Sequence, residues 1–511
     1  MRDILNEIFL HLHPGSGEPF EERTEEDNDN STALATCARV CKSFSEPALD
    51  VLWHSLPDCI PLLSILSAFQ KIPVAEAPSG GEFRFEGSGH VYMLCGEISS
   101  FEWTRFKSYS RRVRILYRYP DIAIDSLVYQ ILFVQNNGQP LLPLVRELHY
   151  QPESHSDMTI PFLGSHSLLT VHVNLYCWPP SDIRAQNALE TIFRNICLAV
   201  PHLEQLIFYS SRLSNSAKQK VPTGAFGNLK RLYISTISDW EFVRSLAALG
   251  QLTYLRAELD FQNTVVSRCS GFPMLEDLSV SGSLPHITLL LANIYASNLR
   301  TVDSTDTVIA PTVSLQDYIL YFTALSTLSR SLCEISLTYY PEIVITASFQ
   351  AVVKPLLNLH SLTSITLHLF GIDVPLAVSD IEVMAKTWPQ LAMFSFRGNF
   401  RTPSLPVTIL IAFAELLPGL KVLTLHQLDV TTIPSGNSIP ILSHGLQKLH
   451  IECYDEEFPN PALLAQFIDS IFPHIATDPP PTSADSWEKV LGFVQQFQLS
   501  RQQQMKRMLE N

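Results

Sequence analysis

Several absences in the sequence exclude whole classes of protein. Pro, Ser or charged residues interrupt every apolar stretch before it reaches the roughly 20 residues that a membrane-spanning helix needs. The opening stretch, MRDILNEIF, carries acidic residues and is followed by no small-residue cleavage site, so we expect no signal peptide. The P-loop, G-x-S-x-G, H-E-x-x-H and paired C-x-x-C motifs are all missing. We therefore expect no membrane association, no catalytic residues and no enzyme activity.

Basic residues and paired cysteines are also scarce. The 35 Lys and Arg residues are outnumbered by 50 Asp and Glu residues, which gives a net charge of −15. A phosphate-binding surface needs a basic stripe, so we expect no nucleic-acid partner. The nine cysteines are scattered and odd in number. Together with the missing secretion signal, this predicts reduced thiols and a cytoplasmic or nuclear location, or both.

Apolar residues, by contrast, are abundant. The chain of 511 residues is too long for one compact core, and 46% of it is hydrophobic against 17% charged. A continuous buried spine with little outer surface per residue would give this balance. Length and composition therefore predict either several domains or one elongated repeat array.

A short motif, L-x-x-L-x-L, recurs through most of the chain. The spacing between first positions runs from 23 residues, as between Leu252 and Leu275, to 35 residues between Leu168 and Leu203. Apolar and polar residues alternate within each copy, which predicts a β-strand with one face in a core. The twelve copies begin at Val145, Leu168, Leu203, Leu229, Leu252, Leu275, Leu299, Leu332, Leu362, Leu391, Leu420 and Leu446.

Helical patterns fill the gaps between these motifs. In residues 181–201, Ser181 is an expected N-cap, and Ile192, Phe193 and Ile196 share one helix face. Twelve such units are too many for chance and resemble leucine-rich repeats. The resemblance implies an α/β solenoid with parallel strands inside and helices outside. Only Asn399 fills the Asn position of the regular repeats, which predicts an irregular array.

The first 53 residues resemble an F-box, the roughly three-helix motif that docks on the Skp adaptor of cullin–RING ubiquitin ligases. Ile4-Leu5-x-x-Ile8-Phe9-x-x-Leu12 corresponds to its first helix, and LATCARVCKSFSEPALDVLW (34–53) to the second and third. With the repeats, the chain resembles a large group of fungal F-box/leucine-rich-repeat proteins. The resemblance implies adaptor binding through Ile4, Leu5, Ile8, Phe9, Leu12, Leu34, Val40, Phe44, Leu49 and Trp53.

The helical reading of this segment also follows from its residues. Leu34, Cys37, Cys41 and Phe44 fall on one helix stripe, and Ser45 can cap a following helix. Three short helices cannot bury this much apolar surface among themselves, which implies a protein partner. The segment departs from the family in two ways. Its opening Leu-Pro is missing, and an acidic insert, expected to be a solvated loop, occupies residues 13–31.

Four segments result from these patterns. Residues 1–53 form the F-box-like module, 54–140 a connecting layer of helices and strands, and 141–477 the repeat array. Residues 478–511 form a Pro-rich break and a C-terminal helix. Within the connecting layer, residues 101–119 are expected to form one aromatic–basic surface helix with Trp103 and Phe106 inward.

Two of the 16 histidines fall at matching outward positions in neighbouring repeats. These are His149 and His172, and adjacent strands lie only about 4.8 Å apart. The pair alone lacks a third ligand, so we expect solvated face residues and neither a metal site nor a cofactor.

The function implied by the resemblance is that of a substrate-recognition subunit of a Skp–cullin–F-box ubiquitin ligase. The partners would be the Skp-type adaptor with its cullin–RING ligase and an unknown protein substrate. The alternative is a leucine-rich-repeat interaction scaffold that does not bind the ligase. Substrate contacts are expected from the outward strand residues Tyr233, Ser235, Ser336, Thr338, Thr366, His368, Ser395, Arg397, Thr424, His426, His450 and Glu452.

Overall fold

The structure is a computed structural model of the whole chain. It describes residues 2–12, 25–73, 90–118, 124–152, 159–175, 183–210, 226–261, 266–306, 314–328, 330–340, 345–370, 372–398, 405–426, 428–434, 440–451, 458–477 and 485–510. The chain divides into two compact units. Unit 1 comprises residues 1–255 with 262–264, and unit 2 comprises residues 256–261 with 265–511.

The main sheet has 14 strands, and every neighbouring pair recorded within either unit is parallel. All twelve L-x-x-L-x-L copies form strands, each beginning two residues after the first motif position. The predicted α/β repeat fold with parallel strands is therefore confirmed. The main-sheet strands, in order, are β1 (Ser55–Leu56), β4 (Ile115–Arg118), β5 (Glu147–Tyr150), β6 (Thr170–Leu175), β7 (Gln205–Ser210), β8 (Arg231–Ile237), β9 (Tyr254–Leu259), β11 (Asp277–Gly282), β13 (Thr301–Thr305), β14 (Glu334–Tyr339), β16 (Ser364–Leu369), β18 (Met393–Arg397), β20 (Val422–Leu425) and β22 (Lys448–Ile451).

The pairing register of neighbouring strands makes the hydrophobic core continuous within each unit. In unit 2, Ile335 of β14 pairs with Ile365 of β16, which pairs with Phe394 of β18. All three side chains are buried. Because each apolar motif position lies beside its counterpart in the next strand, the repeats build one spine instead of separate cores.

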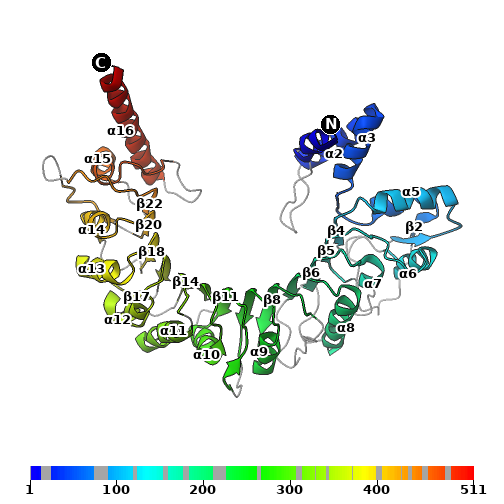
Figure 1. Cartoon of the computed structure of the whole chain (residues 1–511), viewed down its shortest axis with the longest axis horizontal. Helices are drawn as coiled ribbons and strands as arrows, with labels where there is room; N and C mark the ends of the chain where they lie inside the picture. Colours follow the sequence, from blue (N-terminus) through cyan, green and yellow to red (C-terminus); the bar gives the residue numbers. More distant parts are fainter. Residues whose placement is uncertain are drawn as a thin grey trace. The chain divides into compact units, whose positions relative to one another are not determined.

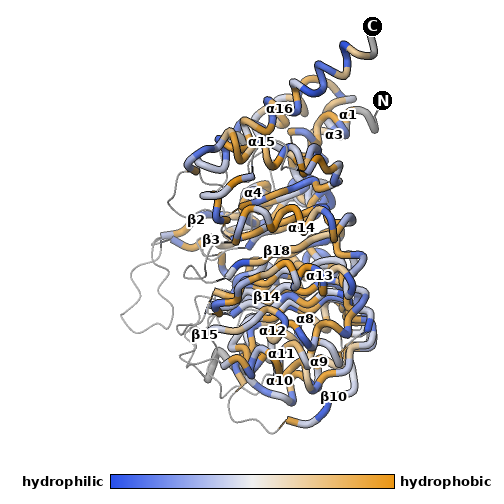
Figure 2. Tube along the Cα trace, turned by 90° about the vertical axis from the view of Figure 1, so that its left-hand side faces the viewer, coloured by the Kyte–Doolittle hydropathy of each residue, from blue (hydrophilic) through white to orange (hydrophobic). Residues whose placement is uncertain are grey.

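Helices cover the apolar side of these strands (Figure 1). In unit 2, helices α10 to α14 follow one another along one side of strands β11 to β20, and α14 is almost wholly apolar (Figure 2). The helices are α1 (Arg2–Leu10), α2 (Glu25–Val40), α3 (Lys42–Leu52), α4 (Ile60–Leu63), α5 (Ser100–Ser110), α6 (Ser126–Gln135), α7 (Ile160–Leu163), α8 (Ile183–Ala199), α9 (Trp240–Ala247), α10 (Leu284–Asn293), α11 (Leu315–Leu328), α12 (Phe349–Val353), η2 (Lys354–Asn358), α13 (Val378–Thr387), α14 (Ile409–Leu416), α15 (Pro461–Ile471) and α16 (Asp485–Glu510).

Short strands outside the main sheet complete the architecture. An antiparallel hairpin joins two of them in unit 1, and three parallel pairs follow in unit 2. The pairs are β2 (Phe69–Pro73) with β3 (His90–Leu94), β10 (Cys269–Ser270) with β12 (Ile294–Tyr295), β15 (Ile345–Thr346) with β17 (Ile372–Asp373), and β19 (Leu405–Pro406) with β21 (Leu428–Asp429).

The sequence prediction of one helix over residues 101–119 is wrong in its second half. Helix α5 ends at Ser110, and β4 then joins the main sheet beside β1 and β5. The motif is disguised here because its third apolar position is Arg118. That side chain is nevertheless buried, with its guanidinium 5.4 Å from the ring centres of both Tyr129 and Tyr150. The two aromatic faces offset part of the cost of burying the charge.

Helices α1, α2 and α3 of the N-terminal module surround a small core of their own. Its buried members are Phe9, Leu34, Ala48 and Val51. The predicted continuous stripe from Leu34 to Phe44 is interrupted, because Cys41 is extended (φ −159°, ψ 166°) and separates α2 from α3. Cys41 is consequently exposed and occupies the N-cap position of α3, where Ser45 was expected, without a side-chain hydrogen bond to the helix.

The acidic segment differs from the loop that its composition predicts. Residues 13–24 lie outside the described residues, but 25–31 belong to α2. Once the Ala-rich stretch that follows has nucleated a helix, each preceding residue adds a backbone hydrogen bond at little further cost. Acidic composition alone therefore mispredicts these seven residues.

The last helix covers the end of unit 2. Trp487, Val490 and Val494 of α16 are fully buried, and α16 packs against α15. Arg501 forms an ion pair with Asp469 of α15. Beyond Arg501 the described side chains are exposed. The helix therefore caps the final repeat with its first half and leaves its last residues in solvent.

A glycine at the end of β11 provides a test of the backbone packing. Gly282 has φ +137°, and a Cβ there would lie 2.4 Å from the Leu259 carbonyl oxygen. We expect Gly282→Ala to lower the free energy of unfolding by about 1–3 kcal/mol, measured by urea denaturation.

Gly445 supplies the matched control, since it lies in the same unit and a Cβ there meets nothing within 4 Å. Gly445→Ala should change the free energy of unfolding by less than about 1 kcal/mol. Equal losses in the two variants would contradict the close approach at Gly282.

Candidate functional site on the strand face

Each main-sheet strand has one side in the core and one side pointing away from the helices. We call the second side the strand face. In β14 its members are Ser336 and Thr338, which are half-buried, whereas Ile335 and Leu337 between them are fully buried. The alternation in β16 is the same, with Thr366 and His368 on the face. In each unit the repeat helices lie on the other side of the strands (Figure 1).

Register aligns the candidate substrate residues of unit 2 in two rows. Ser336, Thr366, Ser395, Thr424 and His450 are successive register partners across five strands. Since neighbouring strands lie about 4.8 Å apart, this row is a continuous polar ladder.

The second row is shorter and includes a charge. Thr338 pairs with His368, which pairs with Arg397. His368 also links the two rows, because its Nδ1 lies 3.3 Å from the Thr338 hydroxyl and its Nε2 lies 3.1 Å from the Ser395 hydroxyl. These bonds hold the imidazole in place before any partner arrives.

Unit 1 presents an aromatic part of the strand face. Tyr233 of β8 lies with its ring centre 4.9 Å from that of Tyr254 in β9. Arg231 donates a hydrogen bond of 3.1 Å to the Tyr233 hydroxyl, and its guanidinium lies 4.8 Å from the Tyr254 ring centre. Ser235 follows on the same strand and is half-buried. This group combines a cation with two flat apolar surfaces.

Two candidate substrate residues are less accessible than expected. Ser395 and His426 are buried, with 9% and 6% of their surfaces exposed. Ser395 is hydrogen-bonded to His368 of the neighbouring strand, and His426 directly follows the last residue of β20. Glu452, like Asn399, lies outside the described residues. The other nine candidates are half-buried.

The candidate adaptor-binding residues fall into three groups. Phe9 and Leu34 are internal to the module core, and Ile8 and Val40 are exposed. The side chain of Ile4 lies outside the described residues. The remaining five, which are half-buried, are Leu5, Leu12, Phe44, Leu49 and Trp53.

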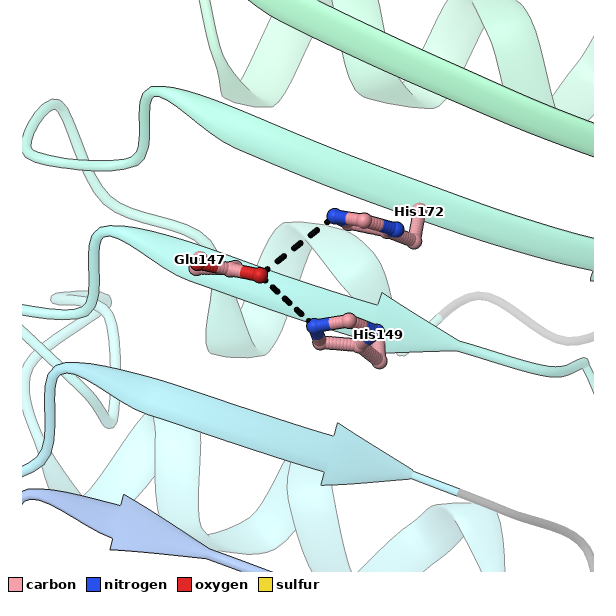
Figure 3. Close-up of side chains that lie close together, drawn as sticks. All are labelled: Glu147, His149 and His172. Atoms are coloured by element: carbon pink, nitrogen blue, oxygen red, sulfur yellow. Dashed lines mark hydrogen bonds and ion pairs between the residues drawn. The ribbon is translucent and has the colours of Figure 1, made fainter. Parts of the chain in front are cut away.

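A cluster of two histidines and one carboxylate lies on the strand face of unit 1 (Figure 3). Glu147 and His149 are two residues apart on β5, and His172 is the register partner of His149 on β6. The Glu147 Oε1 atom lies 2.7 Å from His149 Nε2 and 3.4 Å from His172 Nε2. Among the described residues this is the one group of three such side chains whose ligand atoms all lie within 4.8 Å of one another.

The prediction that both histidines are solvated and lack a third partner is wrong. His149 is only 4% exposed, because its ring is stacked between Tyr117, at 4.3 Å, and His172, at 3.9 Å. Sequence reasoning also missed Glu147. Its signal was present, since a residue two positions before His149 on a strand must share its face.

Electrostatics favour an ionised carboxylate at this cluster. Hydrogen bonds from His149 and then His172 lower the pKa of Glu147 to about 2, against the opposing effect of burial. Burial lowers the pKa of His149, mainly because it penalises the charged imidazolium. Near neutral pH the cluster therefore presents a carboxylate and a neutral His149 imidazole.

Solved leucine-rich-repeat structures resemble parts of this chain at low identity. An internalin from Listeria monocytogenes matches at 14% identity with a TM-score of 0.31, covering 61% of this chain and 82% of its own. The leucine-rich-repeat ectodomain of the Arabidopsis thaliana receptor kinase GASSHO1/SCHENGEN3, in complex with CASPARIAN STRIP INTEGRITY FACTOR 2, matches at 14% identity and TM-score 0.27, covering 67% and 39%. A leucine-rich-repeat protein from Leptospira interrogans matches at 13% identity and TM-score 0.26, covering 69% and 90%.

No family model and no curated protein sequence matches the chain. The structural likenesses are too weak to carry an argument about partners, so the repeat fold rests on the strands and register of this chain. Among the described helices, none combines the length and the apolar character that crossing a bilayer requires.

Proposed function

We propose that this chain is a protein-binding scaffold that serves as the substrate-recognition subunit of a Skp–cullin–F-box ubiquitin ligase. Residues 1–53 would bind the Skp-type adaptor, and the strand face would bind a protein substrate. The chain itself would catalyse nothing, since transfer of ubiquitin belongs to the cullin-bound RING and its conjugating enzyme. Its contribution is to raise the effective concentration of substrate lysines near that enzyme.

Apolar exposure on the N-terminal module is the observation that carries this proposal. Phe9 and Leu34 are buried in the module's own core. The side chains of Ile8, Leu10 and Val40, by contrast, are 52%, 52% and 64% exposed. Large apolar side chains gathered on so small a unit favour a protein partner. Three helices of the expected order over residues 2–52 also agree with the F-box resemblance.

Firm attachment of the module to the first repeats supports a positioning role. Arg112, which follows α5, forms ion pairs with Glu46, at 2.7 Å, and with Asp50, both on α3. The guanidinium is largely buried between them, with 11% of its side chain exposed. The rings of Trp53 and Tyr109 meet at 4.5 Å beside these pairs. A partner held by the module would therefore be held at a fixed place relative to strands β1 and β4.

The chemistry of the strand face suits a protein or peptide substrate. Its hydroxyl and imidazole rows offer both donors and acceptors at regular spacing, while Arg397 and Tyr233 add charge and aromatic area. The bonds of His368 to Thr338 and Ser395 order part of this surface in advance, which lowers the entropy lost on binding.

The second candidate function is a leucine-rich-repeat interaction scaffold that does not bind the ligase. One observation favours it. Two of the ten residues assigned to the adaptor, Phe9 and Leu34, are occupied by the module's own core and are not available to a partner.

Adaptor binding is tested with exposed residues only, because changing Phe9 would unfold the module. We expect Ile8→Lys with Val40→Lys to weaken binding of purified Skp adaptor to the full chain. Burying one such side chain contributes about 1.5–3 kcal/mol, so each loss corresponds to roughly tenfold to a hundredfold in Kd. Surface plasmon resonance on the immobilised chain measures it.

Val134→Lys on α6 is the matched control, since Val134 is 75% exposed and lies outside the module. It should bind the adaptor as the unmodified chain does. If the unmodified chain shows no adaptor binding, the chain is a scaffold outside the ligase and the first proposal fails.

Substrate binding is tested by charge and ring changes on the strand face. We expect Arg397→Glu and Tyr233→Ala, each made separately, to reduce recovery of co-purifying substrates at least about tenfold in quantitative affinity capture. Adaptor binding should be retained in both, because neither residue belongs to the module.

Two further variants complete this comparison. Lys386→Glu, an exposed residue of helix α13, makes the same charge change away from the strand face and should leave substrate recovery intact. Removal of residues 502–511 deletes the solvent-exposed end of α16. If only that deletion reduces the recovery of substrate, the substrate binds to the C-terminal helix and not to the strand face.

A further inference from the structure

We propose that Glu147, His149 and His172 form a binding site for one divalent transition-metal ion of the zinc type. The site lies on the strand face of unit 1, on the adjacent strands β5 and β6. It is independent of adaptor binding, because none of the three residues belongs to the N-terminal module.

The three ligand atoms lie within 4.8 Å of one another, and one of their distances already equals that of a metal site. Zinc binds His nitrogen and carboxylate oxygen at about 2.0–2.2 Å, so tetrahedral ligand atoms lie roughly 3.3–3.5 Å apart. The distance of 3.4 Å between Glu147 Oε1 and His172 Nε2 already has this value. The 2.7 Å contact between Glu147 Oε1 and His149 Nε2 is a hydrogen bond that an entering ion would have to lengthen by roughly 0.6–0.8 Å.

Both imidazoles turn the same nitrogen toward the carboxylate (Figure 3). Because the register places His149 directly beside His172, and β5 places Glu147 on the same face, the backbone brings all three together without a loop. The Nδ1 atom of His172 is buried and has no hydrogen-bond partner among the described residues. Without an ion, Nε2 carries the ring proton toward Glu147. A metal would take the Nε2 lone pair and leave the proton on Nδ1, so its binding competes with this hydrogen bond.

The donor set selects the kind of ion. Two imidazoles and one carboxylate suit zinc, copper, nickel or iron, whereas magnesium and calcium require mainly oxygen ligands. Three protein ligands leave at least one coordination position open. Glu147 is one third exposed at its side chain, so that position is reached from solvent.

The rings are also preorganised. Tyr117 covers one face of His149 and His172 covers the other, at centroid distances of 4.3 and 3.9 Å. Side chains held by packing lose little freedom when a metal binds, and rigid support of this kind raises affinity. The competing interpretation is a purely hydrogen-bonded cluster in which Glu147 accepts from both rings.

Zinc titration of the full chain distinguishes these two interpretations. The protein is stripped with a chelator, exchanged into chelator-free buffer with a phosphine reductant, and titrated with zinc chloride in a calorimeter. We expect the unmodified chain to bind one equivalent of zinc tightly at the cluster. The Kd of this equivalent should rise at least about tenfold in His172→Ala and in Glu147→Gln, because each variant loses a ligand. Scattered thiols bind zinc equally in every variant, so the comparison isolates the cluster.

His368→Ala is the matched control. This histidine lies on the same kind of face but between two hydroxyls, at Thr338 and Ser395. The His368→Ala variant should therefore bind one equivalent of zinc as tightly as the unmodified chain. Zinc should likewise raise the melting temperature of the unmodified chain and of His368→Ala, but not of the two ligand variants.

The proposal is overturned if the unmodified chain binds zinc no more tightly than Glu147→Gln and His172→Ala. It is equally overturned if His368→Ala loses the same equivalent. Glu147→Gln is nearly isosteric, so it decides the matter alone should His172→Ala fail to fold. Circular dichroism of each metal-free variant establishes the folded state before titration.

Discussion

The structure depends on parallel pairing of its repeat strands without a register slip. Each backbone ladder fixes the next motif copy beside the last, so Leu148 lies next to Val171 and Ile335 next to Ile365. A slip of one residue would exchange every core side chain with a face side chain. The ladder therefore determines both the apolar spine and the polar rows at once. The hydrogen bonds that build the core thus also fix which polar side chains lie next to one another on the strand face.

Such a ladder needs protected ends, because an open strand edge exposes unpaired backbone groups. In unit 2 the last repeat is followed by α15 and α16, where Trp487 and Val490 bury their side chains completely. In unit 1 the chain enters through the three-helix module, which Arg112 ties to the loop before β4. The terminal helices thus perform a structural task as well as any binding task. A variant of their buried residues would disturb the repeats and the partner together.

The sequence is sufficient to predict the twelve repeat strands, but it does not predict every strand of the main sheet. Twelve strands followed from Leu-rich alternation, since burial of the motif is nearly complete in each copy. The strand at 115–118 was missed because its third apolar position is Arg118, whose burial between two tyrosine rings cannot be read from hydropathy. The helix at 25–31 was missed for a related reason. Acidic composition predicts solvation, whereas helix propagation depends on the neighbours that follow.

The histidine cluster shows where alternation fails as a guide to function. Alternation assigns a residue to the core or to the face, and the face was equated with solvent. In a parallel ladder, however, face side chains are about 4.8 Å apart and can bury one another. His149 is enclosed in this way by Tyr117 and His172, and Ser395 is bound to His368. Face residues therefore divide into those that bond along the ladder and those that remain open to a partner. These two kinds of face residue are distinguished only when the sequences of neighbouring strands are aligned in register. A single copy of the motif does not distinguish them.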